Sequence, residues 1–223
     1  MSSREAILGR VRRSLGVSVT DTTRLSAVGH RLAEHTVNVI PARGQLPAAE
    51  RVALFVRKAG EVFASVERLE SRNDIPSAVA EYLRSRNLPQ AIRRGEDPRL
   101  ASLPWEGEAQ LAVTVGPSDG KDLVGLSHAD AGVAETGTVV LTSGVANPTT
   151  LNFLPDHHIV VVDSSTIAGD YETVWNDLRR RFGVGLVPRT VNLVTGPSRS
   201  ADIEETLLLG AHGPRSLHIL VVG

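Results

Sequence analysis

The sequence predicts an α/β fold, in which helices cover a mostly parallel sheet. Helical patterns with 3.6-residue spacing alternate with short runs that are almost continuously apolar. Such runs are typical of strands buried on both faces, and their alternation with helices favours parallel strands joined by right-handed crossovers. The strand candidates are residues 111–115, 138–142, 159–163, 191–195 and 217–222.

Length and local patterns divide the chain into an arm and one domain. The 223 residues suffice for a single domain with a large core. Ser2 and Glu5 form a possible capping box before a short amphipathic helix that carries several arginines. Those arginines either dock an acidic partner or form a solvated face. Residues 17–29 are rich in Ser and Thr and lack periodicity, so we expect a linker there. The expected boundaries are an N-terminal helix and linker over 1–30 and an α/β domain over 31–223.

The first half of the domain is expected to alternate helices and strands. Pro47 is well placed to begin a helix, a strand is expected at 61–66, and Asp74 starts a second helix. A weak strand at 90–93 precedes a stretch with several Pro and Gly residues. In that stretch Trp105 is expected to cover the core, with a ligand-stacking role as the alternative.

The second half contains the expected site. Asp170 caps a helix, and the strand 191–195 ends at a Gly-Pro pair. Ser200 then caps a further helix, with Asp202 and Glu204 in its first turn. This arrangement predicts a polar loop at the carboxyl end of a strand, next to a helix N-terminus, where open α/β sheets bind ligands.

Composition excludes several classes of function. The net charge is −1, so nothing overall indicates nucleic acid or an anionic membrane. No apolar run approaches the roughly 20 residues that span a bilayer, and no signal peptide is recognisable, so we expect a cytoplasmic protein without a membrane span. The chain has no cysteine, which excludes disulfides, a cysteine nucleophile and a conventional thiolate-ligated iron–sulfur cluster on this chain.

Four separated motifs resemble the lactate-utilisation (LUD) family, in its stand-alone protein C type. The likeness covers roughly residues 110–223, and the motifs occur in order at sensible spacing. They are Ala134-Glu-Thr-Gly-Thr138, Asn152-Phe-Leu-Pro-Asp-His-His-Ile159, Gly196-Pro-Ser-Arg-Ser-Ala-Asp-Ile-Glu204 and Gly210-Ala-His-Gly-Pro214. One departure is the loop Asn147-Pro-Thr-Thr150, which lacks the basic residue common in the family.

The resemblance implies both a fold and a function. The fold would be similar to that of sugar-phosphate isomerases and coenzyme A transferases. The function would be that of a non-redox subunit or accessory protein of an iron–sulfur system that oxidises L-lactate to pyruvate. The chain would bind a small ligand, cluster-carrying partner proteins, or both. Two alternatives stay open: an enzyme acting on an acyl-coenzyme A or a phosphorylated metabolite, and a regulatory ligand-binding module.

The resemblance and the loop pattern together predict the site residues. Glu135 is either a ligand contact, a covalent nucleophile as in the transferases, or a structural group that caps a turn or pairs with an arginine. His212 lies between glycines in a turn, with proton transfer and a structural hydrogen bond as the two readings. The expected ligand contacts are Thr136, Gly137, Thr138, Gly196, Pro197, Ser198, Arg199, Ser200, Asp202, Glu204 and Gly213.

We predict no tightly bound metal and no covalently bound cofactor. His157 and His158 are adjacent, so on a strand they point to opposite faces and cannot share an ion. His128 and Asp130 lack a convincing third ligand. Dinucleotide, P-loop, nucleophile-elbow and zinc motifs are absent from the sequence. The small ligand is left unidentified.

Overall fold

A computed structural model describes residues 2–183, 186–201, 207–210 and 212–223. The chain divides into two units, Met1–Val39 and Ile40–Gly223. The first unit contains α1 (Ser3–Ser14) and α2 (Thr22–Glu34), and neither helix has a buried residue. The predicted capping box is confirmed, since Glu5 N–H and Ser2 N–H each donate to the other residue's side chain.

The linker expected over 17–29 is wrong from Thr22 onward. Helix α2 begins inside it, because the Asp21 side chain accepts a hydrogen bond from Arg24 N–H at 3.0 Å and so caps the first turn. The Ser- and Thr-rich composition concealed this start.

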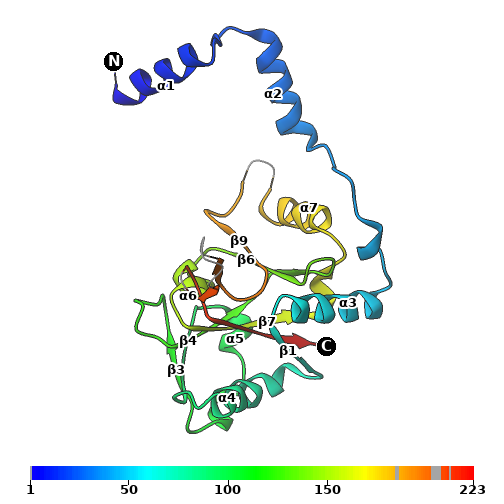
Figure 1. The fold of residues 1–223 in the computed structure, drawn as a ribbon, viewed down its shortest axis with the longest axis vertical. Helices are drawn as coiled ribbons and strands as arrows, with labels where there is room; N and C mark the ends of the chain where they lie inside the picture. Colours follow the sequence, from blue (N-terminus) through cyan, green and yellow to red (C-terminus); the bar gives the residue numbers. More distant parts are fainter. Residues whose placement is uncertain (1, 184–185, 202–206, 211) are drawn as a thin grey trace. The chain divides into compact units, whose positions relative to one another are not determined.

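A six-stranded parallel sheet forms the centre of the second unit (Figure 1). Its strand order is β1-β12-β7-β4-β2-β3, and every neighbouring pair is parallel. The predicted α/β class with a mostly parallel, helix-covered sheet is therefore confirmed. The strands are β1 (Ser65–Leu69), β2 (Ala91–Arg94), β3 (Ala112–Val115), β4 (Val124–His128), β7 (His157–Asp163) and β12 (Ser216–Val222).

A second sheet of four strands, in the order β8-β5-β6-β9, contains two of the predicted apolar strands, those at 138–142 and 191–195. β6 (Thr138–Thr142) pairs antiparallel with both β5 (Ala131–Val133) and β9 (Val191–Val194), while β8 (Ile167–Ala168) pairs parallel with β5. A single sheet holding all five predicted runs is thus wrong. The apolar pattern of β6 reflects burial on both faces, which this strand achieves in an antiparallel pairing.

The helices cover both faces of the parallel sheet. Their bounds are α3 (Ala48–Glu61), α4 (Ile75–Ser85), α5 (Pro98–Ala101), α6 (Thr149–Phe153) and α7 (Tyr171–Phe182), with short 3-10 turns at Ala42–Gly44, Arg72–Asp74, Trp105–Gly107 and Ser164–Thr166. The starts predicted near Pro47, Asp74 and Asp170 are confirmed. The strand expected at 61–66 begins only at Ser65, because α3 extends through Glu61.

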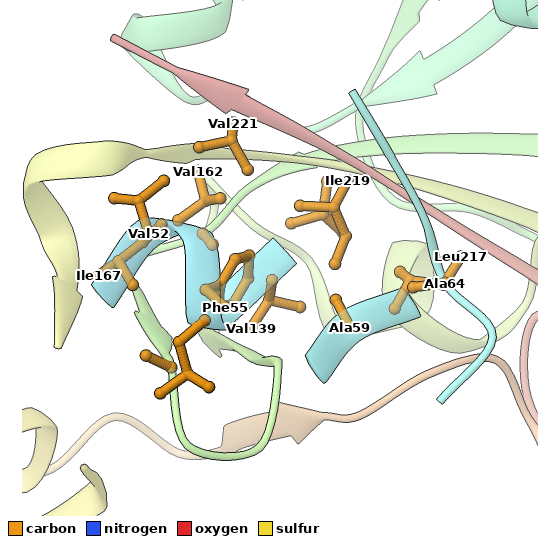
Figure 2. Close-up of a cluster of buried hydrophobic side chains, with 14 of the residues drawn as sticks. Val52, Phe55, Ala59, Ala64, Val139, Val162, Ile167, Leu217, Ile219 and Val221 are labelled. Carbon is orange, nitrogen blue, oxygen red and sulfur yellow. The ribbon is translucent and has the colours of Figure 1, made fainter. Parts of the chain in front are cut away.

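Successive side chains along the central strands point to opposite faces of the sheet, so the core forms two clusters, one under α3 and one under α4. In β7, Val160 and Val162 pack in the cluster of α3, whereas Ile159 and Val161 pack in the cluster of α4. Figure 2 shows the first cluster, with Phe55 of α3 among side chains of both sheets. Trp105 packs against the second cluster and donates its indole N–H to Leu100 O at 2.7 Å, as expected of a core cover. No described helix is long and apolar enough to cross a membrane.

Candidate functional site

A pocket of about 410 Å³ lies where the two sheets meet. β9 and the loop after it form one side, α6 contributes Asn152 and Phe153, and β7 and β12 contribute their second residues, His158 and Leu217. The pocket therefore lies at the amino ends of these parallel strands. The general rule for open α/β sheets favours the opposite edge, but β9 belongs to the antiparallel sheet and brings its own carboxyl end here.

Six of the nominated residues line this pocket. They come from two segments that backbone hydrogen bonds hold together: Ser198 N–H donates to Pro214 O at 2.8 Å, and Gly210 N–H donates to Ser198 O at 3.1 Å. The Ser198 hydroxyl also accepts from His212 N–H at 3.4 Å. The six residues are Gly196, Pro197, Ser198, Arg199, His212 and Gly213.

The helix predicted after the Gly-Pro pair is wrong where the structure describes the chain. Arg199–Ala201 (β10) and Leu207–Leu209 (β11) pair as antiparallel strands, so Ser200 lies in a strand and caps no helix. Asp202 and Glu204 lie outside the described residues.

Three buried polar side chains on the pocket wall are unexpected from the sequence. His158 is fully buried, and Asn152 and Asn192 are 1% and 7% exposed. Each has one atom without a hydrogen-bond partner within the described part of the chain: His158 Nδ1, Asn152 Nδ2 and Asn192 Nδ2. Native proteins rarely leave buried polar atoms unpaired, because each costs about 1–3 kcal/mol. The three unpaired atoms are themselves buried, so they lie behind the accessible surface of the pocket.

A short hydrogen-bond chain joins Ser127, Asn152 and His158 on this wall. The hydroxyl of Ser127, at the fourth position of β4, donates to Asn152 Oδ1 at 3.2 Å and contacts His158 Nε2 at 3.0 Å. The contact places Nε2 of the ring at a hydroxyl, and the tautomer of the imidazole decides which of the two atoms donates. Burial lowers the pKa of His158 to about 3, so the ring is neutral at neutral pH.

The rim of the pocket carries a positive charge. The Arg199 guanidinium lies over the Phe63 ring, 3.2 Å from its centroid. Stacking of this kind holds the long arginine side chain in place while leaving its edge available to an anion. His212 is exposed at the same rim.

The Glu135–Thr138 loop lies beside the pocket and is joined to it by hydroxyl groups. Thr138 Oγ1 lies 2.7 Å from Thr136 Oγ1, 2.9 Å from Tyr171 Oη and 2.7 Å from Thr195 Oγ1. Thr195 itself lines the pocket. Thr136 and Thr138 are therefore linked to the pocket lining through the hydroxyl of Thr195, and neither lines the pocket itself.

Glu135 is buried, with a side chain 5% exposed, and its Oε2 lies 3.4 Å from Arg43 Nε. That ion pair lacks hydrogen-bond geometry, so Oε2 has no hydrogen-bond partner in the described residues. The Arg43 contact corresponds to the structural alternative expected for this carboxylate. Glu135 does not line the 410 Å³ pocket.

The carboxyl edge of the parallel sheet holds a charged network that the sequence did not reveal. Arg72 pairs with Asp163 at 2.5 Å, and His128 Nε2 lies 3.6 Å from the same carboxylate. Arg99 pairs with Asp97 at 2.6 Å. The network's charges are matched, which is typical of a structural role. In the part of the chain that the structure describes, no group of three or more His, Asp or Glu residues is placed to hold a metal.

Comparison with known proteins gives the family. The model of the LUD domain matches residues 44–222. Lactate utilization protein C of Geobacillus sp. strain WCH70 is 40% identical over 100 residues, which are 44% of this chain and 42% of that protein. The protein of the same name from Bacillus subtilis strain 168 is 38% identical over 100 residues, with the same coverage of each chain. These matches span less than half the length of either relative.

A solved structure shows the same fold. A DUF162 family protein from Deinococcus radiodurans superposes with a TM-score of 0.54 at 23% identity, covering 80% of this chain and 99% of the other. The family model spans the two sheets, the pocket and the loops that carry the recognised motifs. The chain belongs to the LUD domain family.

Proposed function

We propose that this chain is a non-redox, ligand-binding component of a lactate-utilisation system. The observation that carries the proposal is the 410 Å³ pocket, which six residues of the recognised loops line and to which Arg199 brings a positive charge. A small anionic or polar metabolite would fit such a pocket. Pockets that bind metabolites combine apolar walls with a few converging polar groups, and this pocket has both.

The system is proposed from the relatives named lactate utilization protein C. With no cysteine in its 223 residues, the chain has no thiolate ligands for an iron–sulfur cluster. Electron transfer in such a system would then belong to cluster-carrying partner proteins, and this chain would bind a ligand, dock onto those partners, or do both. Co-purification under anaerobic, reducing conditions addresses the partners separately from the ligand.

A ligand screen tests the proposal. The isolated protein is expected to gain about 2.7 kcal/mol of stability from a ligand at ~100 times its dissociation constant. That gain raises the melting temperature by roughly 5–10 °C for a chain of this size. The panel comprises lactate, pyruvate, other small acids, coenzyme A esters, nucleotides, flavins and sugar phosphates.

Asn192→Ala is expected to reduce the shift of any true ligand, because it removes an amide side chain from the pocket lining. Asn176→Ala is the matched control, since Asn176 is exposed on α7 away from the pocket. A screen in which no compound shifts the melting temperature would contradict ligand binding. So would a shift that is unchanged in Asn192→Ala.

One observation favours the alternative of a coenzyme A transferase-like enzyme. Glu135 has a buried carboxylate oxygen without a hydrogen bond, as a nucleophile awaiting an acyl group would have. If the chain transfers acyl groups by this route, Glu135→Gln is expected to abolish the transfer, measured with acetyl-coenzyme A and small acid acceptors. Transfer that persists in Glu135→Gln would exclude the covalent role.

A further inference from the structure

The strand β9 leaves one of its two edges unpaired. Among the strands that the structure describes it pairs only with β6. Ser143 N–H donates to Thr190 O at 2.9 Å just before β9 begins, and in an antiparallel ladder the hydrogen-bonded positions recur at every second residue. Asn192 and Val194 therefore direct their backbone groups to β6. The residues whose N–H and C=O groups point to the free edge are Val191, Leu193 and Thr195.

This free edge opens onto the pocket. All three outward-pointing residues line it, and Leu193 is 42% exposed, so the edge is accessible, unlike the unpaired side-chain atoms buried behind the wall. No further backbone hydrogen bond joins the three to the residues that the structure describes. The outward groups repeat every second residue, about 7 Å apart, which is the repeat of an extended chain. A second strand matches such a row of donors and acceptors.

The sequence of β9 does not protect this edge. Natural edge strands commonly carry charged residues, proline or a bulge, which block pairing with other chains. The edge strand β1 of the parallel sheet follows this rule, since it carries Glu67 and Arg68. β9 reads Val-Asn-Leu-Val and has neither a charge nor a proline. Its free edge is therefore able to add a strand.

We propose that this edge binds an extended segment of a partner protein, which adds to the sheet beside β9 and places a carboxylate at Arg199. The Arg199 guanidinium at the rim, held over the Phe63 ring, favours an acidic residue there. Phe153 and Leu217 offer apolar surface to the side chains of the segment that point into the pocket. The flat edge of a second copy of β9 would leave the pocket of about 410 Å³ unfilled, so the occupant is a single segment. This inference rests on the docking part of the proposed function and names its surface.

Amide hydrogen exchange on the full, unmodified chain tests the free edge. The amides of Asn192 and Val194 are expected to exchange at least about tenfold more slowly than those of Leu193 and Thr195, because only the first two are bonded to β6. Equal protection at all four positions would overturn the proposal.

A peptide tests strand addition. The probe is the acetylated and amidated peptide Glu-Glu-Thr-Val-Val-Leu-Thr, whose last five residues repeat the β6 sequence that already pairs with β9. We expect a dissociation constant below about 1 mM by calorimetry, and slower exchange of the Leu193 and Thr195 amides with that of Asn192 unchanged. N-methylation of its Val, Val and Leu residues keeps every side chain but removes backbone donors, and is expected to weaken binding at least about tenfold. Absent binding, or equal binding of the methylated peptide, would overturn the proposal.

Arg199→Gln tests the carboxylate contact. It is expected to weaken binding of the acidic probe roughly two- to fivefold and to leave a probe with Gln-Gln in place of Glu-Glu unaffected. Arg180→Gln is the control, since Arg180 is exposed on α7 outside the pocket lining. Unchanged binding of the acidic probe to Arg199→Gln would overturn the carboxylate assignment. A metabolite that binds while the peptide fails would refute this inference alone, whereas peptide binding without any metabolite would refute only the ligand-binding part of the proposed function.

Discussion

Lowering the pH from 7 to 5 is expected to remove at least roughly 3–4 kcal/mol from the free energy of unfolding, because the buried neutral His158 and His218 must take up protons on unfolding. The lowered pKa values of His128 and His157 act in the same direction. Burial lowers the pKa of His158 to about 3. Burial, with the positive charge of Arg86 as a second cause, lowers the pKa of His218 to about 4. Both native values lie below the ordinary value of 6.5, so the unfolded chain binds more protons throughout this range.

The direction and limits of the effect follow from those values. At about pH 8 and above neither state binds a proton at these sites, and their contribution to stability is constant. As the pH falls below that point, stability decreases until the native histidines titrate, near pH 4 for His218 and near pH 3 for His158. Glu67 lies 3.7 Å from His218 Nε2, yet this half-exposed carboxylate does not offset the burial.

Urea unfolding at a series of pH values measures the effect. His218→Gln is expected to remove about 2 kcal/mol of the loss between pH 7 and 5, the share of one such histidine. The ring of His218 stacks on Tyr82 with centroids 4.5 Å apart, so this variant is also less stable at pH 7, and only the slope with pH is diagnostic. A slope that is the same in both proteins would contradict the prediction.

Gly137→Ala is expected to destabilise the protein by roughly 2–5 kcal/mol, the sum of left-handed backbone strain and overpacking against a neighbouring helix. Gly137 has a φ of 68°, and a Cβ there would lie 2.2 Å from Ala59 N. The obstructing atom belongs to the backbone of α3, so a side-chain rotation cannot relieve the clash. Urea unfolding at pH 7 measures the change.

Gly60→Ala is the matched control, because Gly60 lies on α3 next to Ala59, the residue that Gly137 approaches. Its added Cβ meets no atom within 4 Å, and helical alanine is favoured over glycine, so we expect unchanged stability or a gain of up to about 1 kcal/mol. If Gly137→Ala stays within about 0.5 kcal/mol of the unmodified protein, the close approach between this loop and α3 is refuted.

The sequence predicted elements better than their assembly. Helix α7 was predicted because Asp170 and the apolar spacing after it are local signals. By contrast, β6 and β9 resemble parallel-sheet strands locally, and only pairing with distant residues assigns them to the second sheet. β4 and β5 escaped prediction because Gly125 and Gly132 interrupt their apolar pattern.

The site was predicted only in part, because its loop residues carry local sequence signals and its buried wall residues do not. Turn-forming residues such as Gly196 and Ser198 stand out in a sequence, and both line the pocket. His158, Asn152 and Asn192 have no local peculiarity, since an unpaired polar atom is a property of the surrounding packing. The adjacent histidines were the available signal, because one of two neighbours on a buried strand must face inward.

The position of β12 has a consequence for how the protein is made. β1 ends at Leu69 and lies at the edge of the parallel sheet, where its neighbour is β12, which begins at Ser216. During translation, β1 leaves the ribosome long before the strand that will pair with it. Pairings across such long separations form slowly, and unpaired strand edges invite association with other chains. The nascent chain therefore carries β1 without its neighbour until β12 has been synthesised, and the central sheet is completed only then.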